Sequence, residues 1–310
     1  MVADELAQDL TDQYVLPGQT ILDPFCGSGR LLAAGCSLAG TRVGIDVNPL
    51  ACLITRAKFA RADPKLLSRV ASEARSAAHC QHHAPPLALA AHRKVEWFSP
   101  KAEQELADIV KWVNGLRLDF SERVIVAAAL SATARDVSFA RKTAWKLHRL
   151  GEADRPMQTT SAWNILSRRL DYCATASEAN QVVSDVEVYC ADATNSESVH
   201  HLSGRVDVVL TSPPYGDSRT TVQYGAASEL CLDIVSRLDG FEAYATQGGR
   251  IDALCLGGKA TEAEDERLAL FWAGKRDSSE ARSAARFLTS LSKACATIGE
   301  LLRPGGQAIF

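Results

Sequence analysis

The stretch that most constrains the fold is residues 20–30, which read TILDPFCGSGR. A short apolar run ends at Asp23, a glycine turn follows at 27–29, and a helix-forming run starts at Arg30. A strand, a glycine loop and a helix in this order let the backbone approach a nucleotide-like ligand closely, because glycine has no side chain to block it. Since a lone Gly-x-Gly is common in α/β proteins, its meaning depends on the motifs that accompany it.

A second buried strand ends in an acid. Residues 42–49 read RVGIDVNP. Asp46 lies about twenty residues after the glycine turn, where a carboxylate can reach both hydroxyls of a ribose at the carboxyl edge of a parallel sheet. The alternative is an Asp that caps the helix beginning at Pro49.

The most specific tetrapeptide is Ser212-Pro213-Pro214-Tyr215, which directly follows the buried run 205–210. Neither proline can donate a ladder hydrogen bond, so the pair cannot lie inside a sheet. We therefore expect a rigid corner at the carboxyl end of a strand, on the same edge as the glycine turn. Such a corner presents carbonyl oxygens and a hydroxyl beside an aromatic ring.

A long segment of different character separates these strands. From 64 to 180 the apolar periodicity is mostly helical, over a length that exceeds a single crossover helix. The helices predicted in it are 65–80, 100–114 and 121–134. The sequence predicts an α/β fold, formed by 1–63 and 181–310, with a mostly parallel sheet, helices on both faces and an all-helical insertion over 64–180.

Composition indicates a cytoplasmic protein that buries a full core, since 46% of its 310 residues are hydrophobic. The first residues are acidic, and no apolar run approaches the roughly 18 residues of a membrane span, so we expect no membrane segment. Nine scattered cysteines without CxxC spacing fit reduced thiols. The run HCQHH at 79–83 is the nearest approach to a metal cluster, but adjacent side chains rarely converge on one ion, and we expect no metal.

Because the net charge is −3, contact with nucleic acid would need a local basic patch. The best patch lies in the insertion and consists of Arg135, Arg141, Lys142, Lys146, His148 and Arg149, with Trp145 among them. It could hold phosphates, with the tryptophan stacking on a base, or it could be a solvated helix face. Arg219, shortly after the corner, could read a guanine, bind a phosphate or form a surface salt bridge.

Two motifs together resemble those of S-adenosylmethionine-dependent DNA methyltransferases that modify exocyclic amino groups. Residues 23–29 are similar to the cofactor loop of that family, and residues 211–215 to its catalytic corner. Residues 44–49 resemble its second cofactor strand, and 302–306 its late turn. A serine at the position of Ser212 is associated with the N4-cytosine enzymes of that family, whereas its adenine enzymes more often carry Asp or Asn at this position of the corner.

This resemblance implies S-adenosylmethionine as the cofactor. The implied cofactor-binding residues are Asp23, Phe25, Cys26, Gly27, Gly29, Asp46, Val47, Asp192 and Ala193. Asp23 would hold the methionine portion, Asp46 the ribose and Asp192 the adenine amino group. Ser212, Pro213, Pro214 and Tyr215 would be catalytic: the hydroxyl and the first proline carbonyl accept the hydrogens of the target amino group, and the ring stacks on a base flipped out of duplex DNA.

The function expected from this resemblance is site-specific methylation of cytosine N4 in duplex DNA, as in a restriction–modification system. The alternatives are an N6-adenine DNA methyltransferase, an RNA guanine-N2 methyltransferase with a similar Pro-Pro-Tyr corner, and a cofactor-binding protein that has lost catalysis. A 5-methylcytosine enzyme would need a cysteine nucleophile, usually after proline, and the sequence has no Pro-Cys pair. The chain stops where an apolar strand begins at Gln307, so we also expect a fragment that lacks the last strands of its domain.

Overall fold

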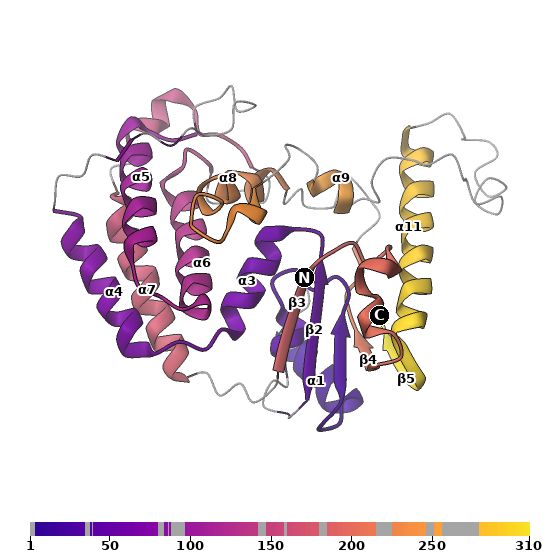
Figure 1. Ribbon diagram of the computed structural model, residues 1–310. Helices are drawn as coiled ribbons and strands as arrows, with labels where there is room; N and C mark the ends of the chain where they lie inside the picture. Colours follow the sequence, from indigo (N-terminus) through magenta and orange to yellow (C-terminus); the bar gives the residue numbers. More distant parts are fainter. Residues whose placement is uncertain are drawn as a thin grey trace. The chain divides into compact units, whose positions relative to one another are not determined.

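The computed structural model describes residues 4–34, 38, 40–79, 84–85, 87, 97–141, 147–157, 160–179, 185–214, 225–245, 251–255 and 279–310. The chain divides into two compact units (Figure 1). The first, here called the sheet unit, comprises Met1–Thr55, Gln181–Val222 and Arg250–Phe310. The second, the helical unit, comprises Arg56–Asn180 and Gln223–Gly249.

The sheet unit is built on a five-stranded sheet in the order β3-β2-β1-β4-β5. Its strands are β1 (Thr20–Asp23), β2 (Thr41–Asp46), β3 (Asp185–Cys190), β4 (Val206–Leu210) and β5 (Leu302–Ile309). Every neighbouring pair is parallel. The chain moves outward from β1 to β3 and returns on the other side of β1 at β4, which is the doubly wound topology. The predicted α/β fold with a mostly parallel sheet is therefore confirmed, and its topology is Rossmann-like.

Helices cover both faces of this sheet. The helical elements of the unit are α1 (Asp4–Tyr14), α2 (Arg30–Ala33), α3 (Pro49–Phe59, which belongs to this unit up to Thr55), η2 (Ser196–Leu202), α9 (Ile251–Cys255) and α11 (Ser279–Leu301). Alternate strand residues face opposite ways: Ile21 packs with residues of α1 and α2, whereas Leu22 packs with residues of η2 and α11. This alternation places one apolar cluster on each face and leaves the polar residues at the strand ends.

The late turn expected at 302–306 is part of strand β5. Leu302 pairs with Val206 and Gln307 with Val208, so the residues between them form an irregularity within β5. Gly305 has a φ of 80°, which a glycine adopts without strain. An ion pair between Arg303 and Asp207 of β4 holds the irregular stretch to the neighbouring strand.

The helical unit contains α4 (Pro64–Ala77), α5 (Pro100–Gly115), α6 (Phe120–Val137), η1 (Glu152–Met157), α7 (Ala162–Ala179), α8 (Gly225–Val235) and η3 (Glu242–Tyr244). α7 packs against α4 and α6, and α8 packs against α6. The sequence predicts that 181–310 belongs as one block to the domain that contains the sheet, whereas Gln223–Gly249 lies in the helical unit. The reason is that most residues of α8 are buried and that α8 packs against the apolar α6.

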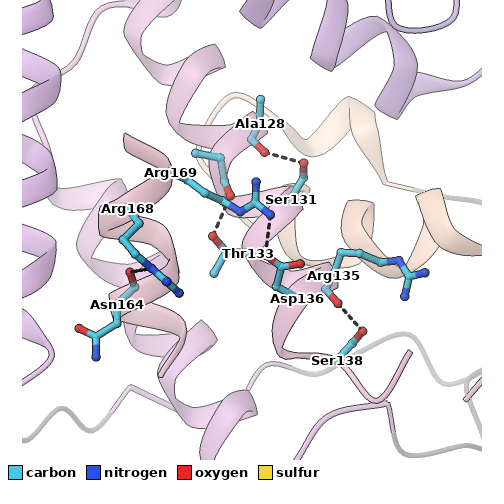
Figure 2. Close-up of polar contacts among 10 residues, drawn as sticks. Ala128, Ser131, Thr133, Arg135, Asp136, Ser138, Asn164, Arg168 and Arg169 are labelled. Atoms are coloured by element: carbon cyan, nitrogen blue, oxygen red, sulfur yellow. Dashed lines mark hydrogen bonds and ion pairs between the residues drawn. The ribbon is translucent and has the colours of Figure 1, made fainter. Parts of the chain in front are cut away.

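Local capping fixes where these helices begin. The side chains of Asp63 and Ser99 accept backbone N–H bonds at the starts of α4 and α5, and each helix has proline in its first turn. At the start of α6, Asp119 and Glu122 form a capping box, in which each side chain accepts the other residue's backbone N–H. Figure 2 shows the other end of α6, where Asp136 pairs with Arg169 of α7 at 2.5 Å.

A candidate active site at the carboxyl edge of the sheet

Four strands deliver polar residues to one edge of the sheet. β1 ends at Asp23 and β2 at Asp46, while Asp192 follows β3 and Thr211 follows β4. Because the strands are parallel, their carboxyl ends meet at the same edge, and the chain reverses its winding between β1 and β4. Crevices at such reversals are where open α/β sheets bind ligands.

The glycine loop after β1 is folded over the end of β2. The Cys26 amide donates to the Ile45 carbonyl at 3.0 Å, and the Gly29 amide donates to the Cys26 carbonyl at 2.7 Å. Gly27 and Gly29 have φ angles of 51° and 72°, in the left-handed region. A Cβ on Gly29 would lie 2.7 Å from Cγ2 of Thr55, whereas a Cβ on Gly27 would meet no atom within 4 Å. The first glycine therefore leaves room beside the loop, and the second allows α3 to approach it.

The Asp46 carboxylate shapes this loop directly. Its Oδ2 accepts the Gly27 amide and its Oδ1 accepts the Asn48 amide, both at 2.8 Å. Burial raises the pKa of the Asp46 carboxyl, and the two amides oppose that rise. The alternative role as a helix cap belongs to Asn48, whose side chain accepts the Leu50 amide in the first turn of α3. Asp46 therefore does not cap α3, and its carboxylate lies at the glycine loop on the carboxyl edge of the sheet.

Asp23 is the most deeply buried acid of the site, with 2% of its surface exposed. Its Oδ1 accepts the Thr211 hydroxyl at 2.6 Å and the Phe25 amide at 3.1 Å. Burial raises the pKa of the Asp23 carboxyl to about 7, the hydrogen bonds from Thr211 and Phe25 lower it, and the nearby Asp46 raises it further. Carboxyls whose pKa is raised by burial and a nearby charge are enriched at functional sites.

The remaining predicted cofactor residues surround these two acids. The Ala191 amide donates to the Asp46 carbonyl at 3.1 Å, which keeps the end of β3 beside the end of β2. Oδ1 of Asp192 accepts both the amide and the hydroxyl of Thr194 at 2.8 Å, and the side chain is half-buried. Ala193 is buried in the core, Phe25 packs against the same cluster, and Val47 is half-buried.

The predicted catalytic corner begins one residue beyond β4. The Thr211 amide still donates to the Ile309 carbonyl of β5 at 3.1 Å, so the ladder continues up to the corner. Ser212, Pro213 and Pro214 are half-exposed. Among the residues that the structure describes, the Ser212 hydroxyl has no hydrogen-bond partner. Tyr215 lies outside the described residues.

Most of this chain is similar in sequence to part of a known protein. The chain is similar to the Type II methyltransferase M.MvaI of Kocuria varians. The two are 26% identical over 297 residues, which cover 84% of this chain and 60% of the Kocuria protein. The chain therefore spans about three fifths of the length of this relative. No family model matches the chain.

Cys26, which the resemblance places in the cofactor loop, faces the protein core. It is 5% exposed, and a Cβ on Gly44 of β2 would lie 3.0 Å from its Sγ. Burial, together with the negative charges of Asp23 and Asp46, raises the pKa of its thiol. Because the thiolate is the nucleophilic form, this cysteine is unsuited to attack a base. Its side chain supports the loop by packing.

The predicted basic patch is not one face of a helix. α6 ends at Val137, Ala140 and Arg149 form an antiparallel bridge, and the Arg141 amide donates to the His148 carbonyl at 2.7 Å. Arg141, His148 and Arg149 are exposed on the two sides of this short pairing. The patch residues Lys142, Trp145 and Lys146 lie outside the described residues, as does Arg219.

Neither a metal site nor a membrane helix is found in the described parts of the chain. No group of three or more His, Cys, Asp or Glu side chains there is arranged to hold a metal ion. Of the run 79–83, only His79 is described. None of the described helices has both the length and the apolar character needed to cross a membrane.

Two residues of the site were not singled out from the sequence. Thr211 was noted only as part of the corner motif, although its hydroxyl contacts Asp23. Thr55 is fully buried in α3, and its hydroxyl donates to the Gly27 carbonyl at 2.9 Å. A threonine inside a helix belongs to no recognisable motif. The signal that could have pointed to it is indirect: the second glycine of a Gly-x-Gly loop allows close packing of a neighbouring helix, so some residue of that helix must contact the loop.

Proposed function

We propose that this chain is an S-adenosylmethionine-dependent DNA methyltransferase acting on the exocyclic N4 of cytosine, of the kind that belongs to restriction–modification systems. The observation that carries the proposal is the hydrogen bond between Asp23 and Thr211, since it joins the glycine loop to the strand end that bears Ser212. A donor loop and an acceptor corner must lie side by side for direct transfer. The similarity to a Type II methyltransferase supports methyl transfer as the reaction and leaves the choice of base to other observations.

The residues present fit a nucleoside cofactor that carries an amino acid. Open space beside Gly27 admits a ligand against the loop backbone. Each Asp46 oxygen accepts one amide and retains a further lone pair for a ribose hydroxyl. Asp23, at the end of the neighbouring strand, would attract the ammonium group of the methionine portion, and Asp192 would accept the adenine amino group. When bound, S-adenosylmethionine supplies a methyl group on a positively charged sulfur.

The target amino group is a poor nucleophile, because its lone pair is delocalised into the ring. The Ser212 hydroxyl and the Pro213 carbonyl would accept its two hydrogens and favour a tetrahedral nitrogen, whose lone pair then points at the methyl group. A hydroxyl without a partner among the described residues is suited to that task. Tyr215 would stack on the flipped base, worth about 1–3 kcal/mol. The choice of cytosine N4 over adenine N6 rests on the serine at 212.

The decisive experiment incubates the protein with tritiated S-adenosylmethionine and mixed-sequence duplex DNA, followed by nucleoside analysis. Labelled N4-methylcytosine supports the proposal. Labelled N6-methyladenine would support a DNA amino-methyltransferase whose target base is adenine in place of cytosine. Label confined to RNA in a parallel reaction, or absent from both nucleic acids despite cofactor binding, would contradict the proposal.

Ser212→Ala tests the role of the corner. Loss of a hydrogen bond that acts in the transition state should slow transfer by about 10²–10³-fold and leave the affinity for S-adenosylhomocysteine unchanged. Ser72→Ala, an exposed serine of α4, is the matched control and should transfer at the wild-type rate. Equal rates in the two variants would remove Ser212 from the mechanism.

A further inference from the structure

Thr211 connects two segments that lie 188 positions apart in the chain. It is 5% exposed, its amide is held by the Ile309 carbonyl of β5, and its hydroxyl is directed to Oδ1 of Asp23. At 2.6 Å this bond is short, as expected for a hydroxyl that donates to a charged oxygen. The backbone is therefore fixed by the sheet, and the side chain is left to act on the carboxyl group.

The Asp23 carboxyl needs a hydrogen-bond donor to be charged in its buried position. Asp23 is 2% exposed, and burial disfavours its charged form. Among the described titratable groups, Asp46 at the end of the neighbouring strand adds to the cost of ionising Asp23. The charge of Asp23 in turn raises the pKa of the Cys26 thiol in the glycine loop. Against these stand the Thr211 hydroxyl and the Phe25 amide, of which the hydroxyl has the larger effect on the pKa of Asp23.

We propose that Thr211 is a positioning residue, whose hydroxyl holds the Asp23 carboxyl charged and oriented for the ammonium group of the cofactor's amino acid portion. This inference rests on the proposed function, since it takes S-adenosylmethionine to be the ligand. Thr211 itself contacts neither the cofactor nor the base in this role. It acts through Asp23, so removal of the Thr211 hydroxyl should change the charge of the Asp23 carboxyl.

The sign of the effect follows from the hydrogen bond. The bond favours the charged carboxylate, so its loss raises the pKa of Asp23 above about 7. Below its pKa the carboxyl is neutral and no longer attracts an ammonium group. Affinity for the cofactor should therefore fall as the pH is lowered through about 7 in the wild type, and should begin to fall at a higher pH without the hydroxyl.

The test measures the dissociation constant of S-adenosylhomocysteine between about pH 5.5 and 8.5, a range that brackets the carboxyl's transition. Two pairs of proteins are compared: wild type with Thr211→Val, and Thr211→Ser with Thr211→Ala. Each pair differs by the hydroxyl while the rest of the side chain is closely matched. Loss of a hydrogen bond to a charged group should move the midpoint upward by about one pH unit and weaken binding at neutral pH by up to about tenfold.

5′-Methylthioadenosine, which lacks the amino acid portion, serves as the second probe. Its affinity should depend little on pH and should be equal within each pair. A purely structural role for Thr211 would weaken both probes together and leave the midpoint unchanged. The Ser and Ala pair keeps the test decisive if Thr211→Val does not fold.

The outcomes separate the two proposals. An upward shift of the midpoint in both hydroxyl-free variants, seen with S-adenosylhomocysteine alone, supports the role of Thr211. Identical midpoints within each pair overturn that role while leaving cofactor binding and methyl transfer intact. If the wild type binds S-adenosylhomocysteine at no pH, both the cofactor assignment and the role of Thr211 fail.

Discussion

Substitution of the two loop glycines by alanine separates their roles. Gly27 and Gly29 both have positive φ angles, at 51° and 72°, so each alanine incurs the backbone strain of the left-handed region, roughly 1–2 kcal/mol. Only at Gly29 would the new methyl group also collide, at 2.7 Å from Cγ2 and 3.0 Å from Oγ1 of Thr55. Overpacking of this kind costs about 1–3 kcal/mol.

The total expected for Gly29→Ala is therefore about 2–5 kcal/mol of unfolding free energy, against about 1–2 kcal/mol for Gly27→Ala. Thr55 is fully buried, so it has little freedom to move aside without breaking its hydrogen bond to the Gly27 carbonyl. The double variant Gly29→Ala/Thr55→Ala removes the colliding atoms. It should be less destabilised than the sum of the two single variants, by about 1–3 kcal/mol.

Equilibrium urea denaturation measures these differences, provided that the variants share one m-value. The affinity for S-adenosylhomocysteine supplies the second readout. Gly27→Ala places its methyl group in the open space beside the loop and should weaken binding out of proportion to its loss of stability. Equal destabilisation by the two alanines, together with no coupling between 29 and 55, would refute this account of the loop.

Two further predictions concern the same edge of the sheet. Asp46→Asn should weaken S-adenosylhomocysteine binding by about tenfold to a hundredfold in a titration, because hydrogen bonds to a charged group are worth about 1.5–3 kcal/mol. The control is Asp12→Asn, which changes an exposed acid of α1. Equal affinity of the two variants for S-adenosylhomocysteine would argue against a contact between Asp46 and the ribose. Iodoacetamide should modify the exposed Cys190 and Cys295 well before Cys26, because Cys26 is buried and its thiol has a raised pKa. Peptide mass spectrometry measures the order of modification. Early modification of Cys26 would contradict its packing role.

The strand ends of this protein were predictable because local sequence determines them. Asp23 is followed by a proline and a glycine turn, and Asp46 ends an apolar run, so each position follows from nearby residues alone. Parallel pairing then brings the two acids to one edge without any further information. The mostly parallel sheet and the helices on both faces follow from the same alternation of strands and helices.

Contacts between distant segments were not predictable in this way. The bond from Thr211 to Asp23 depends on β4 lying beside β1, and threonine is common at strand ends. For the basic patch after the helix predicted at 121–134, the sequence leaves open whether it binds phosphates or forms a solvated helix face. The structure ends that helix at Val137, where Ser138 is extended and Phe139 instead donates its amide to the Trp97 carbonyl.

The pair of acids at the ends of β1 and β2 is costly for the folded state. Burial raises the pKa of both carboxyls, and the negative charge of Asp46 raises the pKa of Asp23 further. An apolar residue at the buried position of Asp23 would avoid this cost, so stability alone gives no reason for a carboxyl there. A bound cation would remove the cost at Asp23, and ribose hydroxyls would offset it at Asp46. The cofactor proposed here carries both groups, an ammonium and a ribose, and this match is the physical reason for expecting it at this edge of the sheet.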